Sequence, residues 1–291
     1  MSTPMTEEEK REFIQELTLM DNEFMSACFA AYPECAQAAL RILIDEPSLL
    51  VQTVKTQEYH AHPTGRAVRT DITATDAGGR RFAVEIQNTD DGLLALRASY
   101  YLAVLRAMSL LKGEDFDKLP ETYIIFITAH DTFGRDQLLY HFQQYDADLG
   151  LLLGDKAHII FVNGELRGEG SAKERLLHDL FCAEPGKMFI PELAHAVHEL
   201  KTTEKGYITM SEVAEKWRAK WREEDLAEGR AEGEARGRAE GRMEGRMEGR
   251  MENSREIAQQ LLRMEGFTPE VVARITSLDV GEVQRLAAQA Q

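Results

Sequence analysis

The segment RTDITATDAGGRRFAVEIQ, residues 69–87, carries the clearest structural pattern of the chain. It contains two runs in which apolar and polar side chains alternate, residues 69–75 and 81–87, and a turn rich in Asp and Gly joins them. Alternation with a period of two is typical of β-strands, and such a turn between two strands is typical of a hairpin. We therefore predict an antiparallel hairpin centred on Gly78.

The register of this hairpin determines which side chains are neighbours. With Gly78 at the centre, residues whose numbers sum to 156 are opposite each other, so Asp71 faces Glu85. Opposed residues share one face of the sheet, with Cβ atoms about 4.5–5.5 Å apart, and like charges there are destabilising. A bound cation would offset that repulsion, and two carboxylates with water and phosphate suit Mg²⁺ or Mn²⁺. A slip of one residue would place Asp71 opposite Ile86 and remove the site.

A second interpretation of the same hairpin is structural. On its second strand the apolar side chains of Phe82, Val84 and Ile86 point to one face. The polar side chains of Glu85 and Gln87 point to the other. A hairpin with one solvated face has the same pattern, so the spacing alone leaves open both a metal site and a solvated surface.

Outward from the hairpin, helical and strand patterns alternate along the chain. Apolar residues recur at helical spacing before and after a strand-rich block, which predicts the α/β class. The expected order is helices within residues 7–50, strands over 50–55, 69–75 and 81–87, a helix over about 93–111, strands over 123–128 and 158–162 separated by an irregular stretch, and helices from 172 onward.

Composition excludes several classes of protein. The 291 residues carry a formal net charge of -16, which argues against a nonspecific basic coat for DNA. Residues 51–100 are locally neutral, with six acidic and six basic side chains, and they contain the hairpin. No secretory signal or long apolar run occurs, so we expect a cytoplasmic protein without a membrane span. The three cysteines form no zinc-ligand motif.

The C-terminal part is organised differently. From residue 228 to 252 the sequence repeats with a period of four and ends in copies of Glu-Gly-Arg-Met. This repeat fits a linker or a helix that self-associates. The tail from residue 254 predicts a small helical hairpin or helix-turn-helix, which fits DNA reading or docking and oligomerisation. We expect three segments: a nuclease-like domain over 1–205, the repeat-containing helical segment over 206–253, and the tail over 254–291.

Beyond these patterns, an ordered set of segments resembles a known family. The hairpin is followed by RASYY at residues 97–101 and KGEDFDKL at 112–119. Together with the Glu-Gly-Arg repeats and the helical tail, they resemble the recombination-promoting nuclease and transposase family of the PD-(D/E)xK superfamily. The resemblance implies a restriction-endonuclease-like core, a mixed central sheet flanked by helices, followed by a helical C-terminal region. It also implies a Mg²⁺-dependent (or Mn²⁺-dependent) DNA endonuclease linked to recombination, mobile elements or phage defence.

The resemblance also assigns roles by position. Asp71 and Glu85 would be the metal ligands, helped by the backbone carbonyl of Ile86. Gln87 stands where the superfamily has a lysine, and glutamine replaces a fixed charge by hydrogen bonds that orient water or phosphate. Because Gln87 lacks that charge, turnover is the part of the prediction that most needs a test.

Further side chains are candidates for binding DNA. Arg97 and Tyr101 lie one helical turn apart and would reach the site together, with Arg97 as a phosphate clamp, and Arg69 is a third candidate. The structural alternative packs Tyr101 in the core and pairs Arg97 with an acid. The superfamily often adds an acid from the first helical region, for which the candidates are Asp21, Glu23 and Glu34.

A different class of function fits the same sequence. The chain would then be a catalytically silent protein that keeps the nuclease fold and interacts through its repeat and tail. That hypothesis predicts self-association that survives loss of Asp71 and disappears on truncation before Glu228. Under either hypothesis, we expect a homo-oligomer formed through the C-terminal region.

Overall fold

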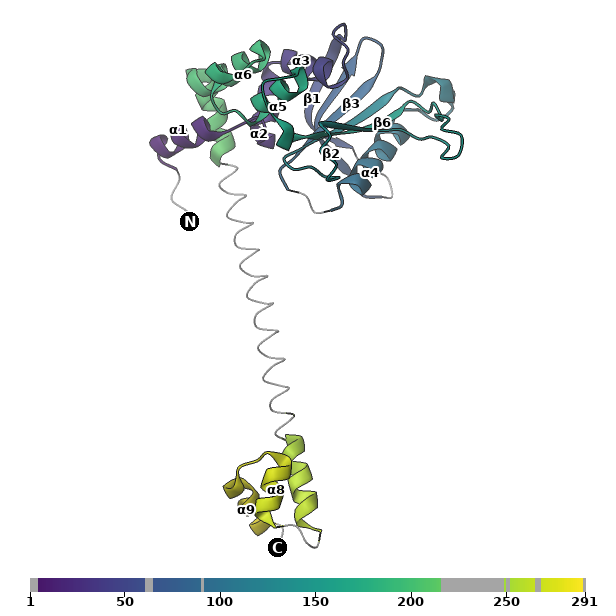
Figure 1. Ribbon diagram of the computed structural model, residues 1–291. Coiled ribbons are helices and arrows are strands. Elements are labelled where there is room, and N and C mark those ends of the chain that lie inside the picture. The colour runs from purple at the N-terminus through teal and green to yellow at the C-terminus, as the bar shows by residue number, and fades with distance from the viewer. Residues whose placement is uncertain are drawn as a thin grey trace. The chain divides into compact units, whose positions relative to one another are not determined.

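The structure is a computed structural model, and it describes residues 5–60, 65–89, 92–215, 249, 252–264 and 268–289. The chain forms two compact units, residues 1–217 and 218–291 (Figure 1). Most of the Glu-Gly-Arg repeat lies outside the described residues. The predicted segment boundaries and self-association through the repeat therefore stay predictions.

The first unit is built on a mixed six-stranded sheet with the order β1-β2-β3-β4-β6-β5. The pairs β1–β2, β2–β3 and β5–β6 are antiparallel, whereas β3–β4 and β4–β6 are parallel. Helices cover the sheet, which confirms the predicted α/β class with a restriction-endonuclease-like core. The strands are β1 (Val51–His60), β2 (Val68–Asp76), β3 (Arg81–Gln87), β4 (Thr122–Thr128), β5 (Leu139–Phe142) and β6 (Ala157–Asn163).

The hairpin of β2 and β3 has the predicted register. Ile72 pairs with Val84 and Thr75 with Arg81, so the paired numbers sum to 156 as expected. At the turn, the side chain of Asp76 accepts hydrogen bonds from the backbone N–H groups of Gly78 and Arg80, at 3.0 and 2.8 Å. Gly79 has a φ of +80°, a conformation that glycine adopts at little cost.

Helices lie on both faces of the sheet (Figure 1). On one face, side chains of α1, α2, α3, α5 and α6 form a core with Phe82, Val84 and Ile86 of β3. On the other face, α4 packs against Ala83 and the buried side chains of β4 and β6. The helices are α1 (Glu7–Glu16), α2 (Asn22–Ala31), α3 (Glu34–Leu43), α4 (Leu94–Ala107), α5 (Ala172–Phe181) and α6 (Pro191–Thr202), with short 3-10 turns η1 (Phe116–Lys118), η2 (Gly164–Leu166) and η3 (Pro185–Lys187).

Two details differ from the sequence-based prediction. The first strand continues to His60, five residues beyond its predicted end, because its pairing with β2 continues as far as His60↔Val68. The stretch predicted to be irregular contains β5, whose four residues pair with β6 from Leu139↔Val162 to Phe142↔Ile159. A strand this short has little periodicity of its own, and a partner distant in the sequence determines it.

The described residues of the second unit are helical and have a small core of their own. Residues 252–262 form a helix, followed by α8 (Pro269–Thr276) and α9 (Val280–Gln289). Ala258, Val272 and Val283 are fully buried at their centre. Among all described residues, no helix is both long and apolar enough to span a bilayer.

Candidate metal centre

Two buried carboxylates lie side by side on the neighbouring strands β2 and β3. The backbone N–H of Asp71 donates to Oε1 of Glu85 at 3.0 Å, and the backbone N–H of Ile86 donates to Oδ2 of Asp71 at 3.1 Å. Only 6% of Asp71 and 3% of Glu85 is exposed. The structure therefore brings the two predicted ligands together, and it places them in a protein environment rather than on a solvated face.

Burial and mutual repulsion act on the protonation of this pair. Burial raises the pKa of Glu85 well above its ordinary value, and the charge of Asp71 raises it further. Burial also raises the pKa of Asp71, although the N–H of Ile86 lowers it. Arg97 and Arg69 lower the pKa of Glu85 but do not reverse the shift. Ionisation of both carboxylates is therefore unfavourable in the protein alone, and a bound cation would offset this cost.

Gln87 and Arg97 form a direct contact beside the carboxylates. The Nη1 of Arg97 donates to Oε1 of Gln87 at 2.6 Å. Because strand residues alternate, Gln87 lies on the same face of β3 as Glu85. Gln87 therefore holds a guanidinium, and the positive charge of Arg97 acts on Glu85.

The carboxylates open into a cleft with a volume of about 700 Å³. Arg69 and Tyr101 line it together with Asp71, Glu85, Gln87 and Arg97, so these six predicted side chains surround one cavity, whereas Asp21, Glu23 and Glu34 do not line it. Tyr101 also packs against the core beneath α4, with its ring 6.0 Å from that of Phe126. Tyr101 therefore packs in the core and lines the cleft at the same time, so the two roles considered for it are compatible. The remaining lining residues are Asn22, Arg66, Ala67, Val68, Leu93, Leu96 and Tyr100.

The sequence pattern did not reveal Gln57, which contacts Asp71 from β1. Its Nε2 donates to Oδ1 of Asp71 at 3.3 Å and to Oγ of Ser26 at 3.0 Å. Gln57 has a φ of +52° in the middle of a strand, a conformation that costs free energy for residues other than glycine. No signal in the sequence marks this position, because a glutamine in a polar strand is ordinary.

The three candidates for an additional acid have different surroundings. Asp21 accepts hydrogen bonds from the backbone N–H of Thr18 at 2.7 Å and from its hydroxyl at 3.2 Å, so it caps the turn before α2. Glu34 lies in the first turn of α3. The charge of Glu23 contributes to raising the pKa of Asp71, which brings Glu23 within electrostatic range of the site.

The donor set fits a hard divalent cation. Within the described ranges, no three side chains of His, Cys, Asp or Glu gather as metal ligands. Asp71 and Glu85 would thus supply two oxygen ligands, and Mg²⁺ is commonly held by one or two carboxylates while water and phosphate complete its coordination. The carbonyl of Ile86 as a further ligand stays a prediction.

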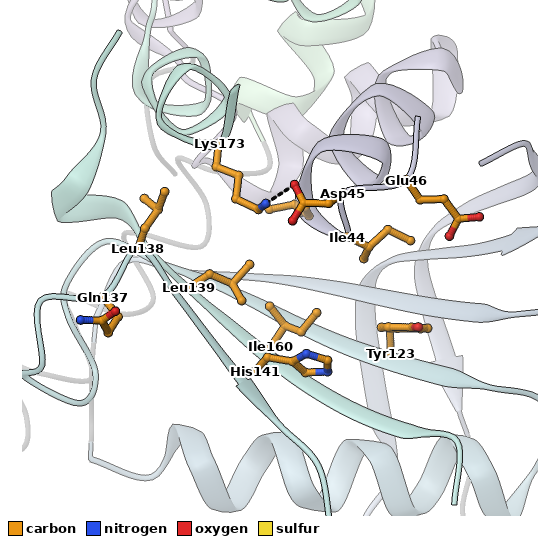
Figure 2. A pocket seen from close by; sticks show the side chains of 11 residues that line it. Ile44, Asp45, Glu46, Tyr123, Gln137, Leu138, Leu139, His141, Ile160 and Lys173 are labelled. Carbon is orange, nitrogen blue, oxygen red and sulfur yellow. Dashed lines mark hydrogen bonds and ion pairs between the residues drawn. The ribbon is translucent and has the colours of Figure 1, made fainter. Parts of the chain in front are cut away.

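A second cavity, of about 410 Å³, lies against the other face of the sheet and lacks this chemistry (Figure 2). Its charged side chains are paired: Lys173 contacts Asp45, and Glu46 bonds to Arg80 at 2.7 Å. Figure 2 shows Lys173 and Asp45 above an apolar floor formed by Leu139 and Ile160. The paired carboxylates belong to the cleft beside α4.

Comparison with known proteins gives one match. Residues 46–177 match the family model described as PD-(D/E)XK nuclease family transposase. No curated protein and no solved structure matches the chain significantly. The matched segment contains every strand of the sheet, α4 and the paired carboxylates. Residues 46–177 are therefore similar to the PD-(D/E)XK nuclease family transposases.

Proposed function

We propose that the chain is a Mg²⁺-dependent (or Mn²⁺-dependent) endonuclease that hydrolyses phosphodiester bonds of DNA. The observation that carries the proposal is the pair of buried carboxylates, Asp71 and Glu85, beside the guanidinium of Arg97. The family match supports a nuclease of this class. The setting would be the cytoplasm, in recombination, mobile elements or phage defence.

The side chains of the cleft divide the chemical work. Asp71 and Glu85, with the carbonyl of Ile86, would hold the metal. When bound, such an ion lowers the pKa of water and stabilises charge on the scissile phosphate. Gln87 would orient water or phosphate by its amide, while Oε1 of Gln87 keeps Arg97 in place.

Arg97 supplies the fixed positive charge that the lysine provides elsewhere in the superfamily. Its guanidinium has several N–H donors in a planar arrangement that matches phosphate oxygens. One of these donors, on Nη1, bonds to Oε1 of Gln87, and this contact helps to fix the orientation of the guanidinium plane. Arg69, on the same cleft, would bind a neighbouring phosphate. Thus the loss of the lysine is compatible with turnover.

A nicking assay on supercoiled plasmid tests the proposal. We expect the parent protein to convert plasmid to nicked or linear forms with Mg²⁺ or Mn²⁺ and to lose this activity in EDTA. Asp71→Asn and Glu85→Gln keep the shape of each side chain and remove its charge, and both should abolish cleavage. Glu58→Gln is the matched control, because Glu58 lies on β1 and pairs with Lys55 at 2.6 Å outside the cleft. Cleavage that persists in both site variants would disprove the proposal.

A further inference from the structure

One face of α4 presents apolar side chains to the cleft that contains the carboxylates. Leu93, Leu96, Arg97 and Tyr100 are spaced i, i+3, i+4 and i+7, so they share a face of the helix, and all four line the cavity. Their exposure is high for apolar side chains: 54% for Leu93, 70% for Leu96 and 38% for Tyr100. A surface that only binds phosphate has no use for such side chains.

The charges of the cleft suit a single strand better than a duplex. Arg66, Arg69 and Arg97 are the basic side chains that line it. Binding to duplex DNA commonly rests on many phosphate contacts, and the chain is strongly acidic. Three arginines match a few phosphates along one strand.

The apolar side chains complement the faces of unpaired bases. In a duplex the base faces are stacked inside, and the protein meets only phosphates and base edges. An unpaired base exposes its face, and stacking on an aromatic side chain strengthens binding by about tenfold per base. Tyr100 provides such a ring, held by a hydrogen bond from its hydroxyl to the carbonyl of Arg66 at 2.7 Å.

We propose that the cleft binds an unpaired DNA strand, with phosphates on Arg66, Arg69 and Arg97 and bases against Leu96 and Tyr100. The inference rests on the proposed nuclease function and names its substrate class: single-stranded DNA, or the single-stranded part of a branched or flapped duplex.

Fluorescence polarisation in EDTA tests binding without cleavage. The probes have one sequence in three forms: single-stranded, fully duplex, and duplex with a single-stranded flap. We expect the single-stranded and flapped forms to bind at least about tenfold more tightly than the duplex. Leu96→Ser removes apolar contact with the bases and should weaken binding of these two forms by about five- to tenfold and leave duplex binding unchanged. Leu151→Ser is the matched control, because Leu151 is 65% exposed and does not line the cleft.

Binding and cleavage together separate this inference from the proposed function. Equal affinity for duplex and single strand, or a Leu96→Ser protein with parental affinity for the single strand, would overturn the inference even if plasmid is cut. Selective binding of unpaired strands without cleavage in Mg²⁺ or Mn²⁺ would support the inference and contradict the nuclease activity.

An independent observation concerns the backbone of Gln57. Its neighbours in β1 keep regular pairing, Thr56 with Ile72 and Glu58 with Thr70, so the backbone departs locally from the strand at Gln57, opposite Asp71. Strained backbone is retained mainly at functional sites, where the surrounding structure enforces it. The amide spans Asp71 and the buried hydroxyl of Ser26 and so limits how the Asp71 carboxylate can turn.

We infer that Gln57 is a positioning residue that keeps Asp71 oriented as a metal ligand. Partners of metal ligands typically change metal affinity by about 10- to 100-fold when removed. This inference also rests on the proposed metal site, but it concerns the hydrogen bond from Gln57 to the ligand Asp71.

Gln57→Asn tests the role without adding strain. Asparagine tolerates positive φ and keeps an amide, but it is one methylene too short to span both partners. We expect its Mn²⁺ affinity, measured by titration calorimetry, to fall about tenfold while the melting temperature stays within about 2 °C. Lys156→Asn is the matched control, because Lys156 also has a positive φ, +59°, and does not line the cleft; it should keep both values.

Two outcomes would overturn the role of Gln57. Parental Mn²⁺ affinity in Gln57→Asn would contradict positioning while leaving the metal site itself supported. A parent protein that binds no Mn²⁺ would contradict both the metal site and the positioning residue.

Discussion

The backbone N–H of Asp71 donates to Oε1 of Glu85 at 3.0 Å, which places the two carboxylates on adjacent strands within one hydrogen-bonded unit. Asp71 in turn accepts a hydrogen bond from the N–H of Ile86 at 3.1 Å. The contacts run in both directions between β2 and β3, so the hairpin register and the geometry of the carboxylates depend on each other. A change in either carboxylate should therefore affect both stability and metal binding.

Replacement of Glu85 by glutamine should stabilise the domain without metal. The buried carboxylate is disfavoured by burial and by Asp71, and glutamine has the same shape without the charge. We expect a rise in melting temperature of about 2–4 °C, which corresponds to about 1 kcal/mol for a domain of this size. Differential scanning calorimetry in EDTA measures it, with Glu58→Gln as the control. A lower melting temperature for Glu85→Gln would show that the charge is stabilised in the native protein.

The stability of the parent domain should fall as pH rises. The folded pKa of Glu85 lies above its ordinary value of 4.5, so the folded protein binds a proton more tightly than the unfolded chain does. This contribution is fully present below that ordinary value and is lost as pH rises through the folded pKa. Melting temperatures between about pH 4 and 9 measure it. The Glu85→Gln protein should lack this pH-dependent contribution to stability, and saturating Mg²⁺ should reduce it in the parent. Identical dependence of the melting temperature on pH in parent and variant would contradict the role of Glu85.

Removal of the charge of Arg97 should impair cleavage more than binding. Arg97→Gln leaves Gln87 without its guanidinium partner, and loss of one donor that stabilises transition-state charge commonly lowers kcat by about 10²–10³. Single-turnover cleavage of an oligonucleotide measures it. In the Arg97→Gln background, Gln87→Lys restores a positive charge at the position of the superfamily lysine and should recover part of the rate. No recovery, or an unchanged rate in the single variant, would argue against Arg97 as the replacement for the lysine.

The dependence of DNA affinity on salt should report three phosphate contacts. For a single strand, the slope of log affinity against log salt is about -0.7 per neutralised phosphate, so three arginines give about -2. Arg69→Gln should make the slope less steep by about 0.7, whereas Leu96→Ser should lower affinity with little change in slope. Polarisation titrations over a range of KCl concentrations separate the two effects. An unchanged slope in Arg69→Gln would remove Arg69 from the phosphate path.

The hairpin and the pairing of its carboxylates follow from local sequence patterns. The turn at Gly78 and the alternation of apolar residues in β3 define a register, because a slip by one residue would move every side chain to the other face. The apolar, β-branched runs of β4 and β6 likewise define buried strands, since their side chains are stable only within a core. These are local patterns, and the chain carries them without reference to distant segments.

The other groups around the carboxylates come from distant elements that packing brings together. The hydrogen bond between Arg97 and Gln87 joins helix α4 to strand β3. The side chain of Gln57 on β1 contacts Asp71 on β2, at a position where the backbone of Gln57 departs from strand geometry. The pairing of β5 with β6 and the apolar face of α4 over the cleft also depend on how separate elements pack. Periodicity reports which face of an element is buried, but it does not report the partner of that face. The paired carboxylates and the place of Arg97 at the site were therefore predictable, whereas the contact of Arg97 with Gln87, the amide of Gln57 and the apolar side chains around the cleft required the folded chain.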